Sequence, residues 1–360
     1  MSSVPLAEPR PLRNRPDVAQ RSTISLSCRI VLWLANFVRT PVARGQLQLV
    51  LAISLITVAP LLFIAPIALK QPGPITRDRF IFAIWPSLLA LATTTFAWQT
   101  TRHLSESASQ FTSILKDGHS CDALHAWQKF FRTWPQVLMA FAIGGFGAIG
   151  SFVRVRQLGL GLVPSMLVAF SVLMPGFMGG LGFYVGAFSP TLPSAFSRCE
   201  FNLHPFSPAT TPEIREIAWS HGRIVFKGMI VGVVLSSPLL YLVSRHTATS
   251  LRFLFVIAIV PAWLVVFWVF GSVHYHLYKL ISKTKMRTQL HLHVLIKRAY
   301  EKLDQPKGNE LERLQQLLEL DKLVHSSPRF ALDTRVVLQA ISSLIAAVIP
   351  VALESLIRRF

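Results

Sequence analysis

Long runs of apolar residues alternate with shorter polar segments along most of the chain. Six of these runs reach the roughly 20 residues that a helix needs to cross a bilayer. A seventh is weaker, because Gln339, Ser342, Ser343 and Glu354 interrupt it. Lipid cannot satisfy open strand edges, and the alternation typical of a membrane β-barrel is absent. The predicted fold class is therefore an all-α, polytopic helical membrane protein with six or seven transmembrane helices, at about residues 47–69, 80–98, 135–153, 159–187, 225–244, 251–273 and, more weakly, 336–357.

On one side of the membrane the polar segments carry helical patterns of their own. Residues 99–134 are expected to form a helical hairpin between the second and third runs. The segment 189–224 is interrupted by prolines, but Thr211 followed by Pro212 is typical of a helix N-terminus. The fifth helix is therefore expected to begin outside the membrane and to enter it without interruption.

The polar segment after the sixth run is also predicted to be helical. No Gly or Pro occurs from His274 to Leu303, so the sixth helix should continue well beyond the bilayer. Asn309 followed by Glu312 resembles a capping box, which predicts that a second helix begins there. The apolar stripe of this second helix should pack against the preceding helix, and it consists of Leu311, Leu314, Leu317 and Leu318.

These patterns divide the chain into four parts. Residues 1–46 are expected to form a basic cytoplasmic tail that is partly disordered, and residues 24–38 within it are compatible with a short surface helix. Residues 47–273 form a six-helix transmembrane bundle. Residues 274–335 form a basic helical hairpin with cytoplasmic exposure, and residues 336–360 form a C-terminal apolar helix that is either spanning or interfacial.

The distribution of Lys and Arg predicts the orientation. Most of the 36 Lys and Arg residues lie in the N-terminal tail and in the polar segments on its side of the membrane. The positive-inside rule therefore places the N-terminus in the cytoplasm and the chain in a cell (inner) membrane as a multi-pass protein. Cys28, Cys121 and Cys199 fall on this reducing side, and no pair among them has metal-ligand spacing.

Acidic residues are missing from the apolar runs, with Glu354 in the weak seventh run as the one exception. The chain is 52% hydrophobic and only 15% charged, against about 25% charged residues in soluble domains. Carboxylates inside a membrane carry much of the chemistry of pumps and proton-coupled carriers. The sequence also lacks the motifs of metalloproteases, serine hydrolases, P-loop proteins and dinucleotide-binding enzymes. The prediction is a protein that is not an enzyme and that holds no metal or cofactor.

A polybasic stretch follows the sixth run and is the strongest local signal for binding. Lys279, Lys283 and Arg287 are four residues apart and share a helix face. Basic groups next to an anionic leaflet favour contact with lipid headgroups, and a specific anionic ligand such as a nucleotide is the alternative. Nucleic acid is not expected, because no recognition fold accompanies the charge. The candidate contact residues are Lys279, Lys283, Lys285, Arg287, Lys297, Arg298 and Lys302.

Small residues at four-residue spacing predict close helix packing in the membrane. The simplest interpretation is that these residues pack helices inside one bundle. The alternatives are a subunit interface or a pore-lining groove. Glu354 is a candidate for gating or ion contact in an oligomer. The predicted packing glycines are Gly144, Gly176, Gly180, Gly182, Gly186, Gly228 and Gly232.

Three functional hypotheses follow from these observations. The first is a non-enzymatic membrane component that acts by assembly, scaffolding or signalling through its cytoplasmic helices. The second is an oligomeric ion or solute channel, or a membrane effector gated by an anionic cytoplasmic ligand. The third is a secondary carrier without carboxylate proton coupling. The expected partners are membrane lipids, with a homo-oligomer and a protein partner both compatible with the pattern.

Overall fold

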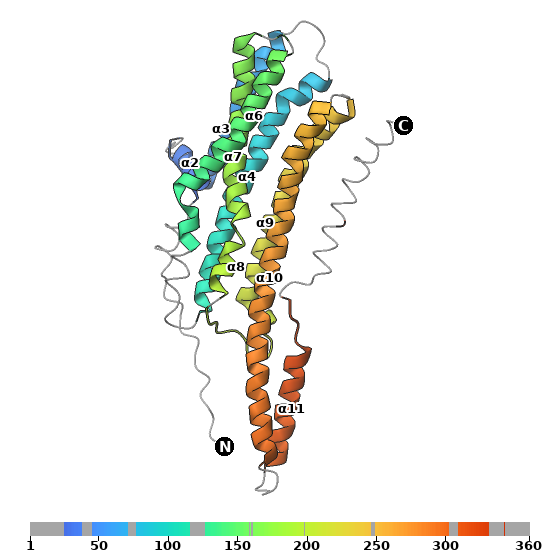
Figure 1. Cartoon of the computed structure of the whole chain (residues 1–360). Helices are drawn as coiled ribbons and strands as arrows, with labels where there is room; N and C mark the ends of the chain where they lie inside the picture. Colours follow the sequence, from blue (N-terminus) through green and yellow to red (C-terminus); the bar gives the residue numbers. More distant parts are fainter. Residues whose placement is uncertain are drawn as a thin grey trace.

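Long antiparallel helices make up the part of the chain that the computed structural model describes (Figure 1). That part comprises residues 25–37, 45–70, 77–115, 127–157, 159, 161–197, 199–245, 249–301, 309–330 and 342. The helices are α2 (Leu26–Phe37), α3 (Gly45–Lys70), α4 (Arg77–Ser113), α6 (Thr133–Gln157), α7 (Leu162–Ala187), α8 (Thr191–Phe196), α9 (Pro212–Arg245), α10 (Thr249–Glu301) and α11 (Glu310–Ser326), with the 3₁₀ turns η1 (Lys129–Phe131) and η2 (Pro208–Thr210).

Five of the described helices are long and apolar enough to cross a membrane, which suggests a multi-pass membrane protein. The predicted all-α class is confirmed, and the predicted count of six or seven spans is confirmed only as far as these five. The run 80–98 lies within α4, and the run 336–357 lies outside the described residues. The five candidate spans are Gln48–Ala65, Thr133–Gln157, Leu162–Phe196, Pro212–Leu235 and Trp263–Glu301.

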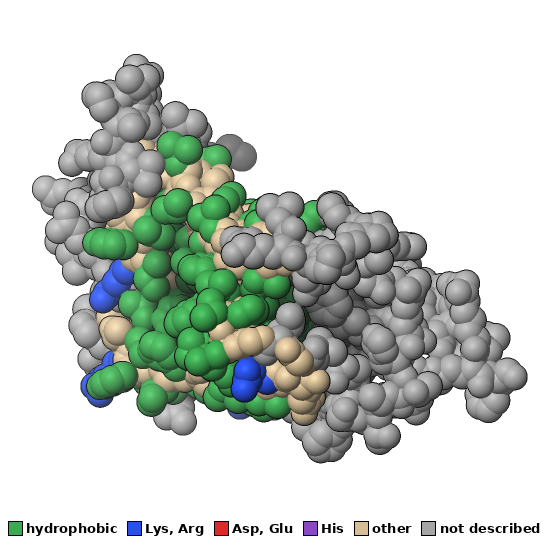
Figure 2. Space-filling model, turned by 90° about the horizontal axis from the view of Figure 1, so that it is seen from above, with side chains coloured by type: hydrophobic (Ala, Val, Ile, Leu, Met, Phe, Trp, Pro, Cys, Tyr) green, Lys and Arg blue, Asp and Glu red, His purple; other side chains and the backbone are tan. Residues whose placement is uncertain are grey.

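The outer surface of the bundle is apolar. On α6 and α7 the side chains of Leu138, Ile149 and Val163 are about two-thirds exposed, at 64%, 67% and 67%. Figure 2 views the bundle end that lies opposite α11, and its described surface is mainly hydrophobic with scattered Lys and Arg. Apolar surface on this scale is costly in water and favourable in lipid, so the bundle surface fits a hydrocarbon environment.

Helices α6 and α7 approach each other closely along a seam of small residues. A Cβ atom added at Gly176 would lie 2.8 Å from Cα of Gly144, and one added at Gly180 would lie 2.6 Å from Cα of Ala140. Such distances leave no room for a methyl group. Backbone therefore rests against backbone at these positions, which is the arrangement that small residues permit in membranes.

A hydrophobic core lies at the end of the bundle where α4 ends and α9 begins. The rings of Phe111 and Phe196 stack with centroids 5.0 Å apart, and Trp127 is buried beside them. The prolines of segment 189–210 do not prevent short helices there, since α8 and η2 both pack into this core. The chain thus forms a packed layer below the predicted membrane region.

Two predicted local features at helix ends differ from the structure. The hairpin expected over residues 99–134 does not stay helical to its end, because Arg132 is extended at φ −59° and ψ 146° and α6 begins afresh at Thr133. The capping box expected at Asn309 does not form, since the Asn309 side chain makes no capping hydrogen bond, although α11 does begin at Glu310. At the start of α9 the Thr211 hydroxyl accepts a hydrogen bond from the backbone N–H of His204, at 3.1 Å.

Helix α10 is 53 residues long and continues past the bundle without a break. At about 1.5 Å per residue it measures roughly 80 Å, more than twice the hydrocarbon thickness of a bilayer. Its lower part extends beyond α8 and the start of α9, and among the described helices α11 lies beside it there (Figure 1). The predicted continuation of the sixth helix is therefore present, and it ends in a projecting α10–α11 hairpin.

Candidate functional site

The α10–α11 hairpin is held together by one apolar seam. Leu292 and Ala299 on α10 are buried, as are Leu314 and Val324 on α11. The rings of Tyr278 and Phe330 stack at 5.2 Å and extend the contact beyond the C-terminal end of α11. Two helices can bury only the stripes that face each other, so the hairpin uses a single stripe from each helix.

The predicted leucine stripe of α11 is therefore only partly correct. Leu314 faces α10, whereas Leu311 and Leu318 are 61% and 50% exposed. On α10, Met286 and Tyr300 are similarly exposed, at 65% and 68%. We call these four side chains the second stripe.

The second stripe lies on one side of the hairpin. At about 100° per residue, Met286 and Tyr300 lie roughly a quarter to a third of a turn from the α10 seam, and Leu311 and Leu318 lie at a similar angle from the α11 seam. Because the two helices are antiparallel, both displacements point to the same side. Leu311 and Leu318 are one heptad apart, and Met286 and Tyr300 are two heptads apart. This is the pattern of helices that pack on two sides.

Lys285 differs from the other basic residues of α10, because it is only 4% exposed. Its Nζ donates hydrogen bonds to the carbonyl oxygens of His325 and Ser327, both at 2.9 Å. These carbonyls belong to the C-terminal end of α11, where the helix dipole favours a cation. The ammonium of Lys285 thus fastens α11 to α10 and does not join the exposed basic face.

Five of the other predicted basic contacts are exposed on α10. Arg287 pairs with Glu200 through Nη1 and Oε1 at 2.9 Å, but both side chains are about half exposed, so this ion pair contributes little. Lys302 and Glu354 lie outside the described residues. The exposed candidates without a described ion pair are Lys279, Lys283, Lys297 and Arg298.

The other predicted packing glycines also lie at helix contacts. A Cβ at Gly182 would lie 3.0 Å from the Phe96 ring, and Gly186 faces the same ring at 3.4 Å. Gly228 contacts Val266, and Gly232 contacts Trp263. These glycines position α7 against α4, and α9 against α10.

A polar chain that the sequence did not predict lies where α4 meets α9. Lys227 Nζ is 2.9 Å from His103 Nε2, and His103 Nδ1 is 3.3 Å from Glu106 Oε2. Arg102 Nε donates to the other Glu106 oxygen at 2.9 Å. Donors and acceptors match if His103 is neutral, with its Nδ1–H donating to Glu106 and its Nε2 accepting from Lys227. Arg102, His103 and Glu106 are three or four residues apart on α4 or adjacent there, so their sequence positions already place them together. Lys227 joins them because α9 packs against α4.

The electrostatics of this chain favour that protonation state. Burial, and then the positive charge of Lys227, hold the pKa of His103 below 6.5. Partial burial raises the pKa of Glu106, but the hydrogen bonds from Arg102 and His103 outweigh it, so that the pKa is lower than the usual 4.5. Glu106 therefore remains ionised and His103 neutral near pH 7.

No group of three or more His, Cys, Asp or Glu side chains in the described part of the chain could hold a metal ion. Comparisons with protein-family models, curated proteins and solved structures find no match to this sequence.

Proposed function

We propose that this chain is a non-enzymatic membrane protein that acts by assembly, with the α10–α11 hairpin as its assembly module. The second stripe carries this proposal. Met286, Tyr300, Leu311 and Leu318 are each at least half exposed and lie on one side of the hairpin, where the exposed His293 stands between Met286 and Tyr300. Burying such a stripe against another helix pair would complete a four-helix bundle. The absence of catalytic motifs from the sequence supports a non-enzymatic role.

We infer that the partner hairpin belongs to a second copy of the chain. Copies in one bilayer share their orientation, so a two-fold axis between them runs along the membrane normal. Each α10 would then lie beside the partner's α11. Beyond residue 274, α10 is strongly basic, whereas α11 carries four acidic side chains against Arg313 and Lys322. Opposite charges would thus meet across the interface and set its register.

The membrane bundle gives this module a fixed position. Helix α10 leaves the bundle through the core that contains Phe111 and Phe196, where Val273, Leu277 and Ile281 are buried. The hairpin is therefore a continuation of a packed helix and not a tethered domain. This rigidity lowers the entropic cost of bringing two hairpins together.

The test compares two leucines on different sides of α11. Leu318→Glu places a charge in the second stripe, and Leu323→Glu places the same charge at a site that is 59% exposed on the opposite side. The mass of the full chain in mild detergent is measured by light scattering over a range of concentrations. The expected result is a dimer for the unmodified chain and for Leu323→Glu, and at least a roughly tenfold higher dissociation constant for Leu318→Glu.

Other outcomes would contradict the proposal. A monomer at every concentration would remove self-assembly as the function. Equal dissociation of both variants, or of neither, would show that the second stripe is not the interface. A circular-dichroism spectrum of each variant checks that its helices remain intact.

A further inference from the structure

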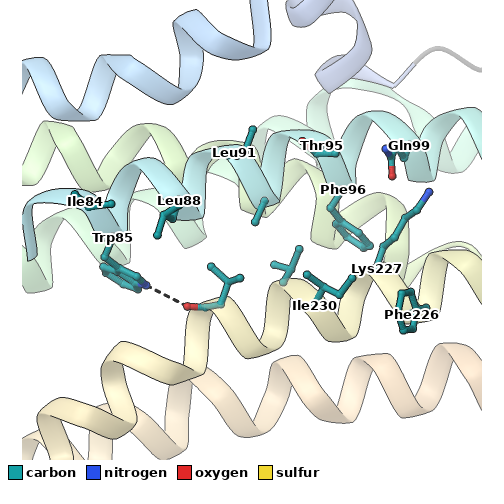
Figure 3. A pocket seen from close by; sticks show the side chains of 13 residues that line it. Ile84, Trp85, Leu88, Leu91, Thr95, Phe96, Gln99, Phe226, Lys227 and Ile230 are labelled. Carbon is teal, nitrogen blue, oxygen red and sulfur yellow. Dashed lines mark hydrogen bonds between the residues drawn. The ribbon is translucent and has the colours of Figure 1, made fainter. Parts of the chain in front are cut away.

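A groove of about 750 Å³ lies between α4 and α9 (Figure 3). Its walls are almost entirely apolar, and Leu88, Leu91 and Ile230 on its sides are 52%, 41% and 44% exposed. Because these exposed side chains lie in the predicted second span and in the candidate span of α9, the groove opens sideways toward lipid. The indole N–H of Trp85 donates to the carbonyl of Val234 at 3.1 Å and joins the two helices at one end.

The opposite end of the groove is polar. Gln99 and Lys227 both line it there, on facing helices (Figure 3). One N–H of the Lys227 ammonium is used by His103, and an ammonium has three such donors. Arg223 is exposed one turn earlier on α9, and the exposed Arg102 lies beside Glu106. Three cations therefore surround this end with a single carboxylate among them.

The groove is longer than the hydrocarbon depth of one leaflet. Its lining on α4 extends from Ile84 to Gln99, which is about 22 Å of helix. One leaflet contributes roughly half of the 30 Å hydrocarbon thickness. An acyl chain that enters beside Lys227 can therefore lie along the groove and reach toward Trp85, while its headgroup stays at the polar end.

We propose that this groove binds an acidic phospholipid of the surrounding leaflet, with one acyl chain along α4 and α9 and the phosphate on Lys227 and Arg223. The apolar walls bury the chain, and each buried methylene contributes about 0.8 kcal/mol. The cations at the polar end select an anionic headgroup over a zwitterionic one. The site is separate from the second stripe, so this proposal stands independently of self-assembly.

The experiment uses Trp85 as an internal reporter. The full chain in an uncharged detergent is titrated with phosphatidylglycerol whose acyl chains carry bromine, which quenches indole fluorescence on contact. The Trp85 contribution is the difference between the unmodified chain and Trp85→Phe. The expected half-saturating concentration is about tenfold lower for phosphatidylglycerol than for phosphatidylcholine with the same chains, which corresponds to roughly 1.4 kcal/mol.

Two pairs of variants separate headgroup from chain binding. Lys227→Gln should raise the half-saturating concentration of phosphatidylglycerol to that of phosphatidylcholine. Lys227→Arg should not, and neither should the control Lys322→Gln, which changes an exposed lysine of α11. Ala92→Phe fills the groove and should abolish quenching by both lipids. Ala142→Phe makes the same change at an exposed position of α6 and should leave quenching unchanged.

Three results would overturn the proposal. Equal quenching by the two lipids would show that the cations do not select the headgroup. Loss of quenching in Ala142→Phe as well as Ala92→Phe would show that chain contact is not confined to the groove. Quenching that occurs only after removal of residues 331–360 would assign the groove to the chain's own C-terminal segment.

Discussion

At the scale of single residues, Lys285 shows how one cation can have a role unlike its neighbours'. It stands two positions after Lys283 on α10, and two positions on a helix turn a side chain by about 200°. That rotation takes Lys285 from the exposed basic face into the seam, where it donates to the carbonyls of His325 and Ser327. Its charge is stabilised by these carbonyls and by the dipole of α11.

Replacing Lys285 by Met should loosen α11 while the bundle stays intact. The variant keeps the side-chain length but leaves two partly buried carbonyls without their donor, at a cost of about 1–3 kcal/mol. Hydrogen exchange of the α11 amides should therefore accelerate by roughly tenfold or more, because about 1.4 kcal/mol corresponds to a factor of ten. Lys283→Met is the matched control, since Lys283 is exposed, and its α11 amides should exchange at the unmodified rate. Unchanged exchange in Lys285→Met would mean that these hydrogen bonds contribute nothing to docking.

The sequence could not show which member of a polar or aromatic cluster is buried. Trp127 and Trp134 both suit a membrane interface by composition, yet Trp127 is 1% exposed in the core and Trp134 is 72% exposed. The difference arises because the chain turns at Arg132 between them. Likewise, the Lys227–His103 contact joins residues 124 positions apart, and no local pattern encodes it.

At the scale of elements, the seam between α6 and α7 depends on where the glycines stand. Gly180 lies directly against the backbone of Ala140, whereas no atom lies within 4 Å of the position that a Cβ on Gly145 would occupy. Glycine is therefore required for helix contact at position 180 but not at position 145. One permits contact between helices, and the other only lowers helix propensity.

Alanine substitutions at these two glycines should shift stability in opposite directions. Gly180→Ala forces α6 and α7 apart and should destabilise the bundle by about 1–3 kcal/mol. Gly145→Ala meets open space and should be neutral or stabilise by up to about 1 kcal/mol. Thermal unfolding midpoints in one detergent measure both changes. Equal shifts for the two variants would show that the seam tolerates separation.

Helix continuity could be predicted better than helix ends. The absence of Gly and Pro from 274 to 303 predicts an uninterrupted helix, and α10 is continuous as far as Glu301. The start at Asn309 was predicted for the wrong reason, since its side chain makes no capping hydrogen bond. The way in which α10 and α11 cross decides which leucines of α11 are buried. Sequence spacing alone cannot distinguish the buried stripe from the exposed stripe beside it.

At the scale of the whole molecule, the structure has two unlike ends. One end carries the end of α6 and the start of α7 (Figure 1), and its described surface is mainly apolar (Figure 2). The other end carries the core around Phe111 and then the basic α10–α11 hairpin (Figure 1). Lys and Arg flank cytoplasmic helix ends preferentially, so this asymmetry predicts that the hairpin lies in the cytoplasm.

Cysteine labelling in bacterial cells that express the chain tests this orientation. With Cys28, Cys121 and Cys199 replaced by Ser, one cysteine is introduced at Gln157, exposed at the end of α6, or at Lys297, exposed on the hairpin. A membrane-impermeant maleimide should label Gln157→Cys in intact cells and Lys297→Cys only in inverted vesicles. The reverse pattern would place the hairpin outside the cell. It would also put Lys227 in the outer leaflet, so the acidic lipid would have to come from that side.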